Sequence, residues 1–319
     1  MLMGRILITG GAGFIGHNTA LMALEMGHEV HILDNLSTGF QANVDLVVKN
    51  GGEFHFADIR DVEAVEVCMA DSDAVIHLAA QVSVPASVDN PKENWDVNVL
   101  GTANVLNIAR KLGITRVIVA SSAAVYGMCD KMPLKESSAG DLLSPYAESK
   151  MENELQVAKY RKEGMEAIAF RFFNVYGPRQ DSNGAYAAVI SKFISLLHQS
   201  KAPTIFGDGG QTRDFIHVKD VSRILLESVS MDWSHEMNLV YNVATQSEIS
   251  LMNLLESLYK ILQEKGVDTT SLQPNFAEER KGDIRHSFAS IESTTSDFSW
   301  RPTVTLYNGL KELVNENGE

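Results

Sequence analysis

Tyr146, Lys150 and Ser122 are side chains that could together remove a proton from a substrate. On a helix, Tyr146 and Lys150 are four residues apart and therefore lie on one face, one turn from each other. A free phenol has a pKa near ~10, so a tyrosine base needs that pKa lowered by roughly 3 pH units, about 4 kcal/mol. A neighbouring ammonium favours the phenolate, and a serine hydroxyl can hold the substrate oxygen. We therefore expect a proton-abstraction site in which Lys150 lowers the pKa of Tyr146.

A glycine-rich segment near the N-terminus predicts a binding site for a dinucleotide that could accept a hydride. Residues 5–9 have the composition of a short buried strand, and Gly10, Gly13 and Gly16 follow it directly, before a helical stretch. This order allows a tight turn, close approach of the backbone to a pyrophosphate, and a helix whose first N–H groups face the phosphates. A plain glycine-rich turn is the alternative, but the ordered strand, turn, helix and second strand favour the dinucleotide.

Asp34 predicts which dinucleotide is bound. It ends the second predicted strand, where a carboxylate can accept a hydrogen bond from the ribose 2′-OH and would repel a 2′-phosphate. Residues 35–40 contain no arginine or lysine that could hold such a phosphate. We therefore expect NAD rather than NADP.

The elements that must position these groups alternate along the first two-thirds of the chain, as in a parallel sheet covered on both faces. We expect strands at 5–9, 29–33, 53–57, 74–78, 116–120 and 167–172, with prominent helices at 94–112 and 146–162. The fold predicted is α/β, with a Rossmann doubly wound parallel sheet in an NAD-binding domain over residues 1–175, to which residues 215–245 return. Residues 176–319 are expected to form mainly a smaller, mixed α/β substrate-binding domain.

Composition narrows the class of protein. The 319 residues are 45% hydrophobic, which suffices for a large core, and two cysteines exclude a disulfide framework or a zinc cluster and suggest a reducing compartment. We expect a cytoplasmic protein, since there is no signal sequence and no run of 18 apolar residues. The net charge of −14 argues against nucleic-acid and membrane partners. His55, His77, His217 and His286 lack metal-ligand spacing, and we expect no metal. His77, at the end of a predicted strand, is expected to be a core or supporting residue.

Two arginines could bind an anionic substrate despite the negative net charge of the chain. Arg213 ends a glycine-rich loop, and Arg280 lies in a second charged segment. A guanidinium presents donors that match phosphate oxygens. Surface salt bridges to Asp214 and Glu279 are the alternative interpretation.

Over nearly the whole chain, from Arg5 to about Tyr307, the sequence resembles the extended short-chain dehydrogenases/reductases of the NAD-dependent epimerase/dehydratase family, and among them the UDP-hexose 4-epimerases. Besides Tyr146 with Lys150, the segments that carry the resemblance are 9–16, 34–39, 58–61, 77–81, 98–102, 121–127, 171–178, 212–218 and 282–287.

The resemblance implies roles for individual residues. Tyr146 would be the base on the sugar 4′-OH, Lys150 would lower its pKa and bind the nicotinamide ribose, and Ser122 would bind O4′. The implied cofactor contacts are Gly10, Gly13, Phe14, Ile15, Gly16, Asp34, Asn35, Ser37, Thr38, Gly39, Asp58, Ile59, Leu78, Ala79, Ala80, Gln81, Asn98, Ala120, Ser121, Tyr146, Lys150 and Phe173. The implied UDP-sugar contacts are Ser83, Val84, Ser122, Ala123, Tyr146, Asn174, Val189, Lys192, Thr204, Ile205, Phe206, Arg213, Arg280, Asp283 and Ser287.

The implied reaction is reversible oxidation at C4′ through a 4-keto sugar, with NAD regenerated in each cycle. Dehydratases and decarboxylases of the family need a further acid beside the serine, where this chain has Ala123 and Ala124, so we favour the 4-epimerase. A UDP-uronate 4-epimerase, a dehydratase or decarboxylase, and a non-catalytic NAD-binding sensor remain as alternatives.

Ser287 and the surfaces of two helices carry two further expectations. By alignment to the family, Ser287 lies beside the sugar 2-position, where its small size leaves room for an N-acetyl group. We thus expect UDP-GlcNAc and UDP-GalNAc as substrates besides UDP-Glc and UDP-Gal. Helices 94–112 and 146–162 carry apolar residues beyond one core face, namely Val97, Leu100, Val105, Leu155 and Val157. The resemblance implies that these helices pair in a homodimer.

Overall fold

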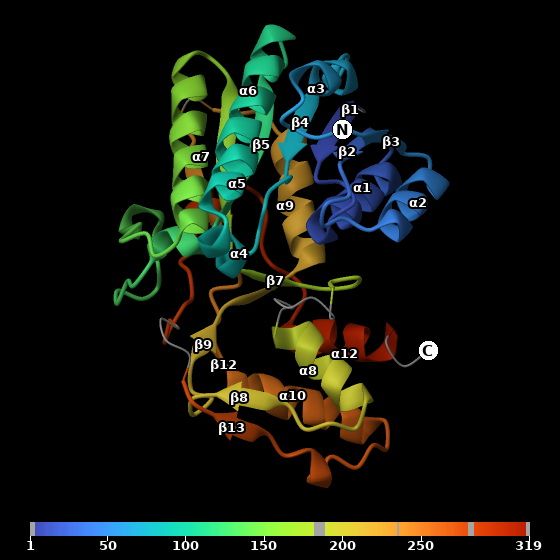
Figure 1. Ribbon diagram of the computed structural model, residues 1–319, viewed down its shortest axis with the longest axis vertical. Coiled ribbons are helices and arrows are strands. Elements are labelled where there is room, and N and C mark those ends of the chain that lie inside the picture. The colour runs from blue at the N-terminus through green and yellow to red at the C-terminus, as the bar shows by residue number, and fades with distance from the viewer. Residues whose placement is uncertain (1–3, 182–188, 235, 280–283, 317–319) are drawn as a thin grey trace.

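A computed structural model describes residues 4–181, 189–234, 236–279 and 284–316 (Figure 1). Its centre is a seven-stranded sheet of order β11-β6-β5-β4-β1-β2-β3, in which every pair is parallel. These strands are β1 Arg5–Thr9, β2 Glu29–Asp34, β3 Glu53–Phe56, β4 Ala74–His77, β5 Arg116–Ser122, β6 Glu166–Phe172 and β11 Val240–Val243. The predicted strands are all present, with ends that differ by no more than two residues.

Helices cover both faces of this sheet because successive side chains of its strands point to opposite faces. Ile6 and Ile8 of β1 pack toward one group of helices, whereas Leu7 packs toward the other. The first group is α1 Phe14–Glu25, α2 Gln41–Lys49 and α9 Val218–Ser230; the second is α3 Val62–Met69, α6 Gly101–Lys111 and α7 Pro145–Lys162. The predicted doubly wound parallel sheet is confirmed.

The strand order reverses beside β1, whose neighbours are β2 and β4. The connections that follow these two strands run to opposite sides of this point, so a crevice opens at the carboxyl ends of the strands. Both the glycine turn after β1 and the segment after β4 lie at this crevice.

The predicted helix 94–112 is present but is not α-helical throughout. It consists of α5 Pro91–Trp95, a π-helical turn over Asp96–Leu100, and α6. The carbonyl of Asn98 accepts from Thr102 Oγ1 at 2.6 Å and from Asn153 Nδ2 at 2.7 Å. Its side chain binds both backbone groups of Gln81, at 2.8 and 3.0 Å. A local π-turn of this kind often marks a functional position in a helix.

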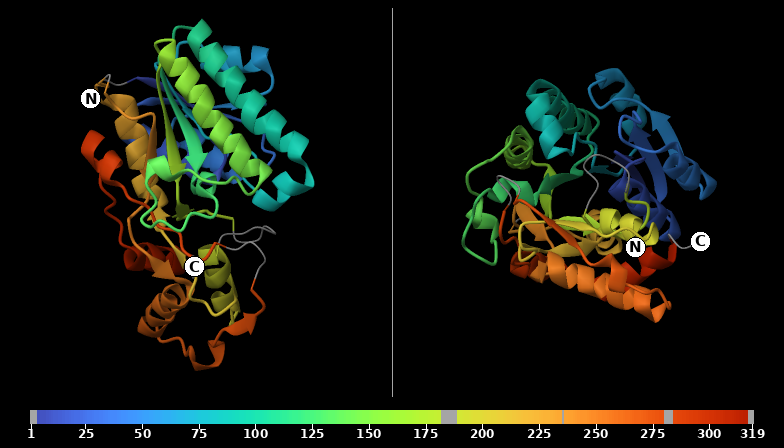
Figure 2. Two further views of the ribbon diagram at one scale, coloured as in Figure 1. Left: turned by 90° about the vertical axis from the view of Figure 1, so that its left-hand side faces the viewer. Right: turned by 60° about the horizontal axis from the view of Figure 1, so that its bottom comes forward.

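The C-terminal part packs below the sheet around its own apolar cluster (Figures 1 and 2). Its helices are α8 Val189–His198, α10 Leu251–Glu264 and α12 Leu306–Glu316. Short ladders pair β8 Thr204–Phe206 with β13 Asn275–Ala277, β9 Thr212–Arg213 with β12 Ile249–Ser250, and β7 Asn174–Tyr176 with β10 Phe215–His217. Two short helices, α4 Val84–Asp89 and α11 Glu292–Asp297, complete the elements used below. The domain boundary near residue 175 stays a prediction.

Within the described ranges, no helix combines the length and apolar character that crossing a membrane requires. The cytoplasmic location stays a prediction.

Candidate functional site

A cleft of about 900 Å³ lies at the carboxyl ends of the sheet strands and extends to the C-terminal part. Of the predicted cofactor residues, those that line it are Gly10, Gly13, Phe14, Ile15, Gly16, Asp34, Asn35, Ser37, Thr38, Asp58, Ile59, Leu78, Ala79, Ala80, Gln81, Ala120, Ser121, Tyr146, Lys150 and Phe173. Of the predicted substrate residues, Ser83, Ser122, Ala123, Asn174, Arg213 and Ser287 line it as well. The structure therefore brings most of the predicted cofactor residues and part of the predicted substrate residues to one cleft.

The glycine turn has the shape that a pyrophosphate needs. Gly10 has φ +71°, and a Cβ on Gly16 would lie 2.1 Å from the Gly10 carbonyl oxygen, so neither position accepts a side chain without a shift. Helix α1 starts after Gly13 with no side-chain cap, and Phe14 and Ile15 of its first turn line the cleft. First-turn N–H groups without intrahelical partners attract anions. These residues fit a dinucleotide diphosphate.

Asp34 is held rigidly at the end of β2. Its Oδ2 accepts from the backbone N–H of Ala12 at 3.0 Å, and its Oδ1 accepts from that of Leu36 at 2.8 Å. Burial raises the pKa of this carboxyl, and the two backbone donors oppose the rise. A carboxylate has about four acceptor sites, so two remain for ribose hydroxyls.

Asp58 and Gly39 complete the region near Asp34. A hydrogen bond from the Arg60 side chain lowers the pKa of Asp58 to about 2, and Asn35 Nδ2 donates to the same carboxylate at 2.8 Å. Gly39 is not among the described residues that line the cleft. A Cβ there would lie 2.7 Å from that of Ala12, so Gly39 lets its loop pack on the glycine turn.

Helix α7 presents Tyr146 and Lys150 to the cleft. The helix starts at Pro145, and the Ser144 side chain caps it by accepting from the Ala147 N–H at 3.2 Å. Lys150 Nζ donates to the Ala120 carbonyl at 2.9 Å and lies 5.9 Å from the centroid of the Tyr146 ring.

Ser122 completes the predicted catalytic group. It ends β5, beside the start of α7, and the influence of its hydroxyl lowers the pKa of the Tyr146 phenol against the effect of burial. The three side chains therefore meet in the cleft, as the sequence predicts.

The predicted lowering of the Tyr146 pKa by Lys150 stays a prediction. Burial raises the pKa of Tyr146, and the opposing influence is the hydrogen bond from Ser122. Burial also lowers the pKa of Lys150 to about 8, since the ammonium loses water, while Glu154 raises it. The sequence argument considered the charge of Lys150 but not the cost of burying both groups.

Glu154 is a residue that the sequence analysis missed. It is buried, pairs with Arg171 through Nε at 2.8 Å and Nη2 at 2.7 Å, and accepts from Ser121 Oγ at 2.5 Å. It lies one helical turn beyond Lys150 on the same face of α7, and this i+4 spacing was the signal that could have identified it. The buried pair thus connects α7 to β5 and β6 beneath the catalytic group.

Asn98 and His77 support the cleft from behind rather than line it. Asn98 fixes Gln81, as described above, and donates to Ser149 Oγ at 3.0 Å. His77 is buried between Thr9 Oγ1 at 2.7 Å and Thr102 Oγ1 at 2.8 Å, and burial lowers its pKa to about 3. It is a neutral core residue, as expected.

On the substrate side, Arg213 Nη1 donates to the carbonyls of Thr212 and Ile284, both at 2.7 Å, while Asn174 Nδ2 donates to the Asp214 carbonyl at 2.9 Å. Asp214 is fully buried and accepts from Thr245, so it organises the loop.

The remaining predicted substrate residues are not gathered at the described cleft lining. Val84, Val189, Lys192, Thr204, Ile205 and Phe206 lie on α4, α8 and β8. Ile205 is buried in the C-terminal cluster. Arg280 and Asp283 lie outside the described residues. The predicted roles of all these residues stay predictions.

Comparisons with known proteins agree with this geometry. The model of the NAD dependent epimerase/dehydratase family matches residues 6–244. A UDP-glucose 4-epimerase from Mycolicibacterium smegmatis is 34% identical over 315 residues, 97% of each chain. A UDP-glucuronate 4-epimerase from Thermodesulfobacterium geofontis is 30% identical over 99% of this chain and 97% of its own.

A solved structure is similar over nearly the same length. The UDP-N-acetylglucosamine 4-epimerase from Methanobrevibacter ruminantium M1, in complex with UDP-N-acetylmuramic acid, superposes with a TM-score of 0.91. It is 36% identical and covers 99% of this chain and 98% of its own.

Proposed function

Because the chain belongs to the NAD-dependent epimerase/dehydratase family, we propose that it inverts the configuration at C4 of the hexose in a UDP-sugar. Its cofactor is NAD, and the prediction of an NAD-dependent enzyme of this family is confirmed. The observation that carries the proposal is the meeting of Tyr146, Lys150 and Ser122 in a cleft that also contains the glycine turn.

When bound, NAD⁺ supplies a hydride acceptor and a positively charged nicotinamide ring. A positive charge in the cleft favours the phenolate of Tyr146, as does the Ser122 hydrogen bond. Lys150, whose pKa is about 8, is still mostly protonated near neutral pH and adds to this effect once its ammonium faces the site. Tyr146 would then take the proton of the 4-hydroxyl. It would return the proton to the same oxygen after the sugar has rotated to present its other face.

Ala123 and Ala124 support epimerisation over dehydration. Both line the cleft directly after Ser122, and a methyl group cannot transfer a proton. Elimination from the sugar needs an acid or base at a second carbon, whereas inversion at C4 needs one group that works in both directions. The chain offers Tyr146 for this single role.

Tyr146→Phe tests the proposal. General acid–base catalysis contributes about 10²–10⁴-fold, so we expect kcat to fall by at least that factor while bound NAD is retained. Turnover is measured with UDP-Glc, UDP-Gal, UDP-GlcNAc, UDP-GalNAc and UDP-uronic acids, with products separated by chromatography. Near-normal turnover of the variant would contradict the role of Tyr146. A wild-type protein that binds NAD but converts none of these sugars would favour the sensor.

Ser287 supports the finer proposal that the acetamido sugars are accepted. It lines the cleft, and its small side chain supports the proposal that an N-acetyl group fits beside the sugar. We propose UDP-GlcNAc and UDP-GalNAc as substrates alongside UDP-Glc and UDP-Gal. In Ser287→Tyr, we expect turnover of the acetamido sugars to be lost and that of UDP-Gal to be kept, because a phenol would fill the space. Equal loss for both sugar classes would count against this role of Ser287.

A further inference from the structure

His31, Glu53 and His55 form a compact cluster on the outer strands of the sheet, away from the cleft. In the β2–β3 ladder, His31 pairs with Glu53, and Leu33 pairs with His55. The side chains share the face covered by α3, and a nitrogen or oxygen atom of each lies within 4.8 Å of those of the others. His31 Nδ1 is 2.9 Å from His55 Nε2, and that nitrogen is 3.5 Å from Glu53 Oε1.

We propose that His31 Nδ1, His55 Nε2 and Glu53 Oε1 bind a Zn²⁺ ion. Two imidazoles and a carboxylate suit zinc, and at Zn–N distances of about 2.0–2.1 Å two ligands of a tetrahedral ion are roughly 3.3 Å apart. The His31–His55 separation must therefore open by only a few tenths of an ångström. The ion would take the place of the proton that the two rings now share.

A second carboxylate, that of Glu29, orients the His31 ring through a hydrogen bond, as is usual for histidines that bind a metal. His31 Nε2 lies 3.1 Å from Glu29 Oε1, so the Nε2–H can donate there and leave Nδ1 with its lone pair. Glu29 is itself fixed by Arg5, whose Nε donates to the same oxygen at 2.7 Å. A carboxylate behind a histidine ligand fixes the tautomer and strengthens the ligand.

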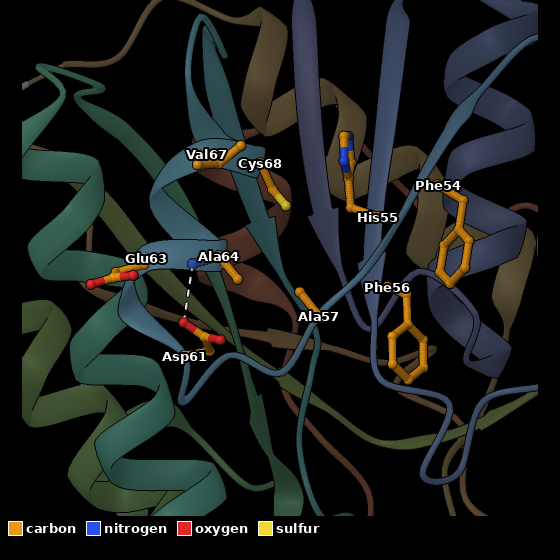
Figure 3. A pocket seen from close by; sticks show the side chains of 9 residues that line it. All are labelled: Phe54, His55, Phe56, Ala57, Asp61, Glu63, Ala64, Val67 and Cys68. Carbon is orange, nitrogen blue, oxygen red and sulfur yellow. Dashed lines mark hydrogen bonds between the residues drawn. The ribbon is translucent and has the colours of Figure 1, made fainter.

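The cluster is open to ions from solvent. The Glu53 side chain is 62% exposed and that of His55 is 22% exposed, whereas His31 is 8% exposed. His55 also lines a pocket of about 570 Å³ (Figure 3), which it shares with Cys68 of α3. Of the three proposed ligands, only His55 is among the residues that line this pocket.

This cluster is not evident from the sequence because its members lie on two different strands, β2 and β3. His31 and His55 are far apart along the chain, and only the parallel register of β2 and β3 brings them together. A zinc ion here would cross-link the edge strand β3 to its neighbour β2. It would therefore stabilise the fold without touching the nucleotide cleft.

Zinc titration of tag-free, NAD-bound protein tests the proposal. After treatment with a chelator, the wild type should bind one equivalent of Zn²⁺ in calorimetry and unfold at a higher temperature, and a chelator should reverse this shift. Substitution of Co²⁺ should give the visible absorption of a tetrahedral site with nitrogen ligands. Absence of a stoichiometric equivalent in the wild type would overturn the proposal.

Variants identify the ligands. His55→Gln and Glu53→Gln should each lose the saturable equivalent, and Glu29→Gln should weaken zinc binding by roughly 10–100-fold. His198→Gln, at an exposed position of α8, is the matched control and should bind like the wild type. Because His55 and Glu53 are partly exposed, these variants should fold, which far-UV circular dichroism checks. Unchanged zinc binding in His55→Gln or Glu53→Gln would assign the ion to another site and refute the proposal.

Discussion

Lys150→Met should stabilise the protein at neutral pH while it abolishes turnover. Lys150 is 4% exposed, and burial lowers the pKa of its ammonium from 10.5 to about 8. At about 1.4 kcal/mol per pH unit, this difference lowers the free energy of unfolding by about 3 kcal/mol below pH 8. Methionine has a similar length and no charge, so it removes this cost.

Part of the gain is offset by a lost hydrogen bond. Lys150 Nζ donates to the Ala120 carbonyl at 2.9 Å, and removing this donor costs roughly 1 kcal/mol. We therefore expect Lys150→Met to raise the free energy of unfolding by about 2 kcal/mol at pH 7.

The pH dependence carries a definite sign. Between about pH 8 and 10.5 the folded lysine is neutral while the unfolded one is still protonated, so the stability of the wild type rises with pH over this range. The advantage of Lys150→Met should accordingly be full at pH 7 and should shrink toward pH 10.

Denaturant unfolding of both proteins from pH 7 to 10 measures these differences. The cofactor is removed first, because a bound dinucleotide changes the surroundings of Lys150. Lys159→Met, an exposed position on the same helix, is the matched control and should change stability by no more than about 0.5 kcal/mol. A Lys150→Met protein that is less stable at pH 7, or an advantage that does not vary with pH, would refute the reasoning.

Two further predictions concern the cofactor turn and the quaternary structure. Gly16→Ala should lose bound NAD, measured by the nucleotide released on denaturation, because its Cβ would lie 2.1 Å from the Gly10 carbonyl oxygen; retention of a full equivalent of NAD would contradict the tight turn. In the predicted homodimer through helices 94–112 and 146–162, Leu100 and Leu155 are expected to form the contact, since they are 50% and 57% exposed. Leu155→Glu should therefore shift the protein toward monomer in analytical ultracentrifugation, and an unchanged sedimentation coefficient would count against this interface.

The exposure of these leucines also corrects the sequence analysis. That analysis grouped Val105 and Val157 with Leu100 and Leu155 as surplus apolar residues for pairing. Val105 and Val157 are fully buried in the core cluster under α6 and α7. The apolar pattern alone could not separate the two sets, because it does not reveal which part of a helix the sheet covers.

The sequence by itself determined the features whose causes are local. The glycines of the turn, Asp34 at the end of its strand, and the four-residue spacing of Tyr146 and Lys150 predicted the cofactor site, the sheet and the catalytic face. Each depends on backbone geometry within a few residues, which the residue types directly limit.

Only the tertiary structure decided the features that depend on burial or on distant segments. It raised the pKa of Tyr146, which the sequence analysis expected to be lowered, and it placed the Glu154–Arg171 pair beneath Lys150. It introduced a π-helical turn at Asn98 and brought His31 to His55 across two strands. A pKa depends on the water and charges around a group, and a contact depends on the register between strands. Neither exists until the chain has packed.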